Sequence, residues 1–324
     1  MNLAVIRREY SPTGGAELYL QRLMPAMIDK GHQVHLYTEN WSQAPIGVQV
    51  HVIEAHGNRS RRPVDFAQQV DSTLRRAQHD CVFSLERTLR QDVYRAGDGV
   101  HRVWLEQRRR FAPAWKSALV GRGGFHRNMQ DLEAHTLDPN NTSRILINSA
   151  MVGRQIESHC AYPPHRMHLI RNGVDVDQFR SGRRLETRRR WGIGEEDYLL
   201  LFVGSGWERK GLRFILQTMK KYPLPGTKLL VAGADRRPWI TPSNVQFTGP
   251  VCAVQDLYAA ADLFVFLPIY EPAANVCTEA LVAGLPVVTC AFNGAAEDIL
   301  ENQTGTVLSR PDDLQAIAAA RSPP

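Results

Sequence analysis

Residues 263–289 read LFVFLPIYEPAANVCTEALVAGLPVVT. The apolar run 263–267 is typical of a short, buried strand of a parallel sheet, and 286–289 is typical of the next strand. Between them the sequence predicts a helix over about 273–282 that ends at Gly284, because glycine readily adopts the left-handed conformation that closes a helix. The stretch therefore predicts a strand–helix–strand unit and an α/β fold.

Two carboxylates lie astride the start of this predicted helix, Glu271 on the loop and Glu279 within the helix. The free amides of a helix start at the carboxyl edge of a sheet suit a phosphate, and a carboxylate further along can accept hydrogen bonds from vicinal hydroxyls. This arrangement indicates a sugar-nucleotide site. The alternative is an ordinary strand and helix with one capping and one surface glutamate.

Similar alternation of strands and helices fills the rest of the chain and predicts two Rossmann-like domains. We expect an N-terminal domain over 1–171, a polar, arginine-rich linker over 172–196 and a C-terminal domain over 197–324. The predicted strands of the first domain are 3–6, 34–37, 50–53, 81–84, 93–96 and 145–148, with helices at 16–28 and 63–78. Those of the second domain are 199–203, 229–232, 245–247, 263–267, 286–289 and 306–308. Ligands are expected in a cleft between the domains, at the carboxyl ends of both sheets.

Composition excludes several classes of protein. No apolar run approaches the roughly 20 residues that span a bilayer, and no signal-peptide core follows Met1, so a cytoplasmic location is expected. The five cysteines lack metal-ligand spacing and are interpreted as reduced structural thiols, including Cys277 as a packing residue. The net charge of +6 allows an anionic partner. No nucleic-acid-binding motif accompanies it, so no nucleic-acid partner is expected.

The Glu271-x7-Glu279 spacing resembles the signature of the retaining, GT-B-fold glycosyltransferases of glycosyltransferase family 4. The segment 172–175, Asn-Gly-Val-Asp, resembles the interdomain segment of that family, and from Gly14-Gly15 to Gly305 the motifs follow the family's order. The resemblance implies that Glu271 lies by the donor sugar and that Glu279 binds the ribose of a nucleotide sugar.

The resemblance also implies a donor-binding set beyond these two glutamates. A glycine pair follows the first strand, a diphosphate-binding loop ending in Lys-Gly follows the first strand of the second half, and the amides around the helix start complete the set. These positions are Gly14, Gly15, Arg209, Lys210, Ala273, Ala274, Asn275 and Val276, with Gly204, Ser205 and Glu297 as further candidates.

One departure from the family pattern concerns the positively charged residue that would bind the diphosphate together with Lys210. Many family members carry an arginine directly after the first glycine of the loop, where this chain has Ser205. Arg209 is then either the substitute or a solvated charge. Glu297 likewise has two interpretations, a residue that orients a hydroxyl or an acid at a helix N-terminus.

The mechanism implied by the resemblance is retaining transfer, in which the acceptor attacks from the face that the diphosphate leaves and a leaving-group oxygen takes the proton. The residues expected to act in catalysis are Asp98, His101, Lys210 and Glu271. Cations stabilise a leaving diphosphate without a metal, so neither a metal nor a cofactor is expected. Glycoside hydrolysis is disfavoured because its two carboxylates must flank the glycosidic bond.

Residues 104–128 mix cationic and aromatic side chains, which is typical of a segment that settles on an anionic bilayer. The alternative is an exposed loop whose aromatic side chains fold inward. The residues predicted to face a membrane are Trp104, Arg108, Arg109, Arg110, Phe111 and Trp115.

This insertion and the Gly-Asp-Gly-Val-His sequence at 97–101 are similar to those of the lipopolysaccharide core glucosyltransferases of the family. That resemblance implies UDP-glucose as donor, a lipid-linked glycan as acceptor, and a peripheral location at the inner face of the cytoplasmic membrane. A soluble acceptor, or a sugar-nucleotide-binding protein with little turnover, are the alternatives. Family members usually continue beyond this point with helices that cross back to the first domain. Because this sequence stops at Pro324, the C-terminal domain is expected to lack these helices.

Overall fold

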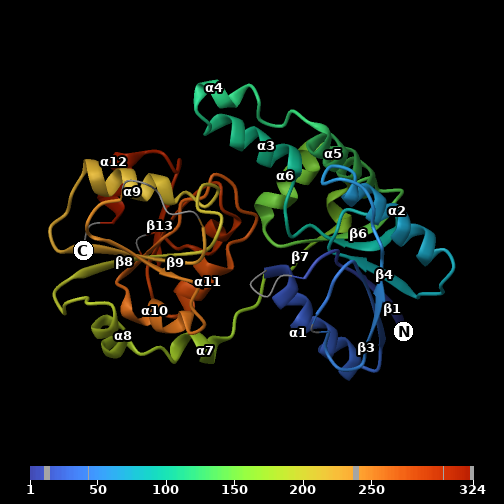
Figure 1. Ribbon diagram of the computed structural model, residues 1–324, viewed down its shortest axis with the longest axis horizontal. Helices are drawn as coiled ribbons and strands as arrows, with labels where there is room; N and C mark the ends of the chain where they lie inside the picture. Colours follow the sequence, from blue (N-terminus) through green and yellow to red (C-terminus); the bar gives the residue numbers. More distant parts are fainter. Residues whose placement is uncertain (11–14, 43, 236–240, 302, 322–324) are drawn as a thin grey trace. The chain divides into compact units, whose positions relative to one another are not determined.

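The computed structural model describes residues 1–10, 15–42, 44–235, 241–301 and 303–321. The chain divides into two compact units, Met1–Asn172 and Gly173–Pro324 (Figure 1). Among the described residues, no helix is both long enough and apolar enough to cross a lipid bilayer.

The described part of the first unit contains a seven-stranded parallel sheet of order β3-β2-β1-β4-β5-β6-β7. Its strands are β1 (Asn2–Ile6), β2 (Gln33–Thr38), β3 (Val48–Val52), β4 (Cys81–Ser84), β5 (Gln91–Arg95), β6 (Thr142–Ile147) and β7 (Met167–Leu169). The six strands predicted for this half are all present. β7 was not predicted, because this three-residue edge strand carries no buried apolar run.

Helices cover both faces of this sheet. They are α1 (Gly15–Asp29), α2 (Arg62–Leu74), α3 (His101–Arg110), α4 (Ala114–Ser117), α5 (Gly124–Thr136) and α6 (Ala150–Cys160), followed by the short 3-10 helix η1 (Pro164–Arg166). Successive strand residues point to opposite faces. Ala4 and Ile6 of β1 therefore pack with Phe66 of α2, whereas Val5 packs with Leu20 of α1.

The second unit has a parallel sheet of order β10-β9-β8-β11-β12-β13. Its strands are β8 (Tyr198–Val203), β9 (Thr227–Ala232), β10 (Val245–Gly249), β11 (Leu263–Val265), β12 (Val287–Cys290) and β13 (Gly305–Leu308). Its helices are α7 (Val176–Arg180), α8 (Arg184–Arg190), α9 (Leu212–Lys221), α10 (Val254–Ala260), α11 (Asn275–Val282) and α12 (Leu314–Ala320), with the 3-10 helix η2 (Gly294–Asp298). Figure 1 shows α9 and α12 side by side over this sheet.

Residues 173–196, which the sequence predicted to be a linker, belong to the second unit. The arginines of this segment attach it: Arg183 pairs with Asp256 at 2.9 Å, and Arg184 pairs with Asp262 at 2.6 Å. Arg188 is buried and donates to the carbonyl oxygen of Ala260. The arginine-rich composition thus reflects ion pairing to α10 and the following turn.

Both sheets reverse their strand order at one point, between β1 and β4 in the first unit and between β8 and β11 in the second. Loops that leave the carboxyl ends of the strands on either side of such a point diverge and create a binding crevice. In the second unit these are the loops after Val203 and after Val265. They carry the predicted phosphate and sugar residues.

Candidate functional site

The loop after β8 crosses the loop after β11 at Gly211. This glycine has φ +79°, and an added β-carbon would lie 1.6 Å from the carbonyl oxygen of Leu267. Glycine is therefore required here both for its conformation and for its lack of a side chain. The amide of Ile269 donates to the carbonyl oxygen of Arg209 at 2.9 Å, which joins the two loops directly.

Lys210 folds back over the start of its own loop. A β-carbon added at Gly204 would lie 2.5 Å from its Nζ atom, and the ammonium lies 5.7 Å from the ring centroid of Phe266. Burial lowers the pKa of Lys210, while the charges of Glu271 and Glu279 act in the opposite direction. The predicted phosphate-binding lysine and both glutamates of the motif thus belong to one electrostatic group.

Arg209 pairs with Glu271, with Nη1 and Oε2 2.5 Å apart and the carboxylate side chain only 16% exposed. Arg209 had two interpretations, a substitute for the missing arginine or a solvated charge. This ion pair to a largely buried carboxylate is not what a solvated charge would make. Ser205, at the position where family members carry arginine, instead accepts a hydrogen bond from the amide of Ala234 at 3.0 Å. It fastens the loop after β8 to the loop after β9.

Glu271 is held through its backbone by the loop after β12. Its amide donates to the carbonyl oxygen of Phe292 at 2.9 Å, and the amide of Gly294 donates to its own carbonyl oxygen at 2.9 Å. These bonds bring η2, which contains Glu297, beside the Glu271 loop.

Asn293 connects the same two loops through its side chain and is 1% exposed. Its Oδ1 accepts from the amides of Ala274 at 3.3 Å and Ala295 at 3.1 Å. Its Nδ2 donates to Thr289 Oγ1 at 3.0 Å and to Cys277 Sγ at 3.3 Å. All four hydrogen-bonding positions of this amide are used, as a buried polar group requires.

The helix after Glu271, α11, begins at Asn275, two residues later than predicted, because the backbone of its N-cap residue Ala274 is still extended. The predicted positions Ala273 to Val276 therefore form the entry and first turn of this helix. Glu279, one turn further, accepts a hydrogen bond from the hydroxyl of Tyr258 at 2.9 Å.

Cys277 is completely buried, as its predicted packing role requires. Burial raises the pKa of its thiol well above the usual range. A thiol without access to its thiolate form is a poor nucleophile.

In the first unit, Asp98 is exposed on the loop between β5 and α3, and His101 is the first residue of α3. The N-terminus of α3 is capped by a distant carboxylate: Glu133 of α5 accepts from the amide of His101 at 2.7 Å. Glu133 also pairs with Arg87 at 2.9 Å, both side chains being under a tenth exposed. This buried pair fixes the loop that presents Asp98.

His101 lies in an aromatic cluster formed by α3 and α5. Its Nε2 lies 3.2 Å from Nδ1 of His126, and Trp104 and Phe125 pack on the same rings. Burial, assisted by the charge of Arg87, lowers the pKa of His101 to about 4. The imidazole is consequently neutral near pH 7.

The residues predicted to face a membrane differ in exposure: one ring packs against its neighbours, other side chains are exposed, and one ring is buried. Trp104 packs against His126 and lies under the guanidinium of Arg108, whereas Trp115 of α4 is 70% exposed. Arg109 and Arg110 are also exposed. The prediction for Phe111 was wrong, since this ring is only 7% exposed and packs inward at the end of α3.

Of the first glycine pair, Gly14 lies outside the described residues, and Gly15 is the first residue of α1. Within the described residues, no three or more His, Cys, Asp or Glu side chains are grouped so as to hold a metal ion.

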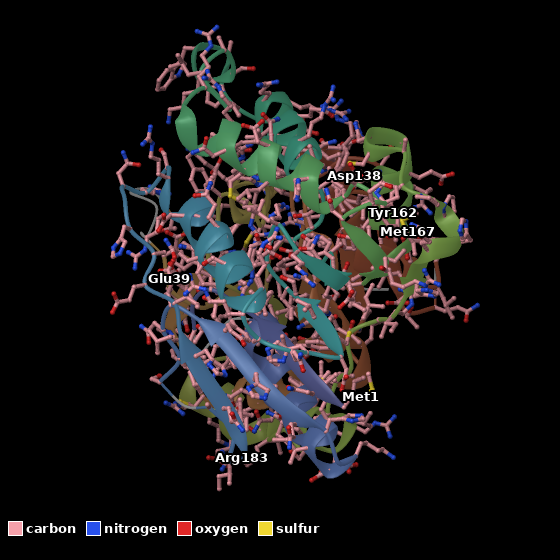
Figure 2. All side chains as sticks on the ribbon, turned by 90° about the vertical axis from the view of Figure 1, so that its right-hand side faces the viewer. Met1, Glu39, Asp138, Tyr162, Met167 and Arg183 are labelled. Atoms are coloured by element: carbon pink, nitrogen blue, oxygen red, sulfur yellow. The ribbon has the colours of Figure 1, made fainter. Side chains whose placement is uncertain are left out.

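Sequence reasoning missed several residues of these sites because their partners are distant along the chain. Tyr258 and Glu133 contact predicted site residues but carry no local motif. It also missed an ion-pair group at the carboxyl edge of the first sheet, where Arg62 pairs with Glu39 at 2.8 Å. Figure 2 shows Glu39 at the carboxyl end of the blue strands and Met1 at the amino end.

Burial raises the pKa of Glu39, although the charges of Arg8 and Arg62 oppose the shift. A second pair at this edge joins Arg7 to Glu86 at 3.0 Å. The only sequence signal for this group was the placement of charged residues directly after predicted strands.

Comparisons with known proteins match each half of the chain to a family of glycosyltransferases. The profile of the family described as "Glycosyltransferase Family 4" matches residues 13–178, and that described as "Glycosyl transferases group 1" matches residues 197–322. The chain is 28% identical to the lipopolysaccharide glucosyltransferase WaaG of Escherichia coli (strain K12), over 96% of this chain and 86% of that protein. It is 23% identical to the uncharacterized glycosyltransferase MJ1607 of Methanocaldococcus jannaschii, over 98% and 87% of the two chains.

Solved structures resemble this one over nearly its full length. The crystal structure of WaaG superposes with a TM-score of 0.83 at 26% identity and covers 98% of this chain and 89% of the other. Sucrose-phosphate synthase from Thermosynechococcus elongatus superposes with a TM-score of 0.75 at 17% identity, over 98% and 88% of the chains. The second likeness concerns the fold alone.

Proposed function

The chain belongs to glycosyltransferase family 4, and we propose from this premise that it transfers glucose from UDP-glucose, with retention, to a glycan of the lipopolysaccharide core. The predicted GT-B fold, with two Rossmann-like domains, is confirmed by the likeness to WaaG. The relationship to WaaG supports the choice of donor and acceptor class.

The observation that carries the proposal is the grouping of Lys210, Arg209, Glu271 and Glu279 at the strand-order reversal of the second sheet. A diphosphate leaving group develops negative charge as the bond to the sugar breaks. Fixed positive groups in a partly buried site stabilise that charge more strongly than they would in water. Lys210 and Arg209 supply such groups, so the proposed reaction needs neither a metal nor a cofactor.

The two glutamates have separate roles in this proposal. Glu271 accepts hydrogen bonds from hydroxyls of the transferred hexose, and Glu279 accepts from the ribose of the nucleotide. The acceptor hydroxyl attacks from the face that the diphosphate leaves, and a phosphate oxygen takes its proton. No protein nucleophile is required.

Asp98 and His101 of the first unit are proposed to act on the acceptor. Asp98 is exposed on a loop that the buried Arg87–Glu133 pair holds in place. His101 is neutral near pH 7, so its imidazole can accept or donate a hydrogen bond according to its tautomer.

A lipid-linked acceptor also calls for a membrane-binding surface, which we assign to the α4 patch: Arg109, Arg110, Trp115, Lys116 and Leu119. Trp115 and Leu119 are 70% and 58% exposed, and the Lys116 ammonium lies 4.7 Å from the Trp115 ring centroid. Aromatic and apolar side chains among cations suit the headgroup region of an anionic leaflet. The proposed location is the inner face of the cytoplasmic membrane.

The test is transfer of labelled glucose from UDP-glucose to lipopolysaccharide truncated to its inner core, with excess chelator present. We expect an α-linked product, detected by NMR, and loss of transfer in Glu271→Gln. Glu208→Gln is the matched control, because Glu208 lies in the loop after β8 with a 70% exposed side chain. An inverted linkage would contradict the mechanism. Binding of UDP-glucose without transfer to any acceptor would indicate a binding protein instead.

A further inference from the structure

Tyr258 of α10 joins three elements of the second unit beneath the donor site. Its ring is 1% exposed and packs against Phe179 of α7 and Phe264 of β11, with centroids 5.7 and 5.6 Å away. Its hydroxyl reaches α11, where it lies 2.9 Å from Glu279 Oε2 and 3.2 Å from the carbonyl oxygen of Val276.

The hydroxyl has one proton, and the shorter contact is to the carboxylate. Burial and the neighbouring charge of Glu279 both raise the pKa of Tyr258, so the group stays protonated and acts as a donor. Hydrogen bonds to a carboxylate are shorter and stronger than those to a neutral acceptor. The rigid, buried ring therefore fixes the orientation of the Glu279 carboxylate.

We propose that Tyr258 is a positioning residue that orients Glu279 toward the ribose and so makes the donor site select ribonucleotides. The inference rests on the proposed function, in which Glu279 binds the ribose hydroxyls. A carboxylate offers about four acceptor positions, so a bond from Tyr258 orients the group and still leaves it able to accept from a ligand.

The test compares the affinities of UDP and 2′,3′-dideoxy-UDP by calorimetry in wild type and Tyr258→Phe. The substitution keeps the buried ring and removes only the hydroxyl. We expect the UDP dissociation constant to rise about tenfold, the size typical of a lost hydrogen bond to a charged group, and that of dideoxy-UDP to stay unchanged. Tyr198→Phe is the matched control, because Tyr198 begins β8 at the end opposite the donor loop.

A second variant separates positioning from packing. In Glu279→Ala the preference for UDP over dideoxy-UDP should be lost, and adding Tyr258→Phe should change it no further, because the hydroxyl then has no carboxylate to orient. An equal loss of affinity for both ligands in Tyr258→Phe would overturn the inference, since it would indicate a purely structural role. So would full retention of the UDP preference in that variant. Failure of the wild type to bind UDP would instead overturn the proposed donor site itself.

Discussion

Arg209 and Glu271 form an ion pair with Nη1 and Oε2 2.5 Å apart, although they leave different strands of the second sheet. A diphosphate that binds Arg209 must therefore compete with Glu271 for the guanidinium. Lys210 has no ion-pair partner within 4.0 Å among the described residues, and its charge is directly available to a ligand. The two adjacent cations are thus expected to differ in their contribution to catalysis.

Lys210→Met should lower kcat by about 10²–10³-fold, because a fixed charge at the leaving group acts mainly in the transition state. Arg209→Met should lower kcat less and raise KM for the donor. Steady-state rates against UDP-glucose concentration measure both. Lys228→Met, which removes a cation paired with Asp197, is the control. Near-native kcat in Lys210→Met would contradict the assignment of this lysine.

Gly211→Ala should destabilise the second unit by about 3–5 kcal/mol, because the new methyl group meets the Leu267 carbonyl and the residue keeps a positive φ. Gly206 is the matched control, since it has a similar φ of +76° but no atom within 4 Å of an added β-carbon. Gly206→Ala should cost only about 1–2 kcal/mol. Urea unfolding compares the two. Equal losses of stability in the two variants would show that the close approach of the Leu267 carbonyl does not restrict the residue at position 211.

Glu133→Ala should destabilise the first unit by about 3–5 kcal/mol, because it leaves the Arg87 charge buried without its partner. It also removes the acceptor for the first amides of α3. Glu106→Ala, which breaks the exposed pair with Arg102, should cost less than about 1 kcal/mol. The free energies of unfolding of both variants test the difference. A small effect of Glu133→Ala would mean that water reaches Arg87.

The first unit should lose stability as the pH falls below about 6.5, the ordinary pKa of histidine. His35, His51 and His79 lie together with Tyr37 on the α2 face of the sheet. Burial lowers the pKa of all three imidazoles. The folded state then binds fewer protons than the unfolded chain, so the free energy of unfolding decreases toward acid pH.

The measurement is the urea midpoint of wild type and His51→Phe between pH 7.5 and 5. The phenyl ring can still stack on Tyr37 but cannot bind a proton, so this variant should depend less on pH. His165→Gln, a change at an exposed position of η1, should behave as wild type. Unchanged pH dependence in His51→Phe would exclude the cluster as its source.

Replacing Trp115 and Leu119 of the α4 patch by Ser should weaken attachment to anionic vesicles and leave UDP affinity unchanged. Removing Arg109 and Arg110 should make the remaining attachment less sensitive to salt, because each cation near the surface contributes about 1 kcal/mol within a Debye length. Vesicle sedimentation at low and high salt measures both. The control is Ser at Ile46 and Val52, two exposed apolar positions of the first unit. Equal release in the control would assign the binding to general hydrophobicity.

The strands were predictable because a parallel strand buried on both faces must be a short apolar run. Leu199 to Phe202 of β8 are all fully buried. The Glu271 and Glu279 positions were predictable because their spacing spans a helix start. The prediction that Phe111 faces a membrane was wrong. Composition shows which residues are aromatic, but it does not show whether an aromatic ring at a helix end points to solvent or into the core.

The supporting contacts were not predictable in the same way. Tyr258 and Glu279 are 21 positions apart, and Glu133 lies 32 positions from His101. Such pairs meet only after the sheet has placed their helices, and neither partner needs a special local sequence. For this reason the residues proposed to touch a ligand are easier to recognise from the sequence than the residues that hold them in place.

Asn293 is followed by Gly294, and asparagine before glycine is the sequence most prone to spontaneous deamidation, in which the next backbone nitrogen attacks the side-chain carbonyl. In the folded chain that nitrogen donates to the Glu271 carbonyl oxygen, and the side chain is held by four hydrogen bonds. The hydrogen bonds that join the two loops therefore also protect Asn293 against deamidation. Heat or denaturant that opens this region would expose a thermolabile asparagine, and the resulting aspartate could no longer donate to Thr289 and Cys277.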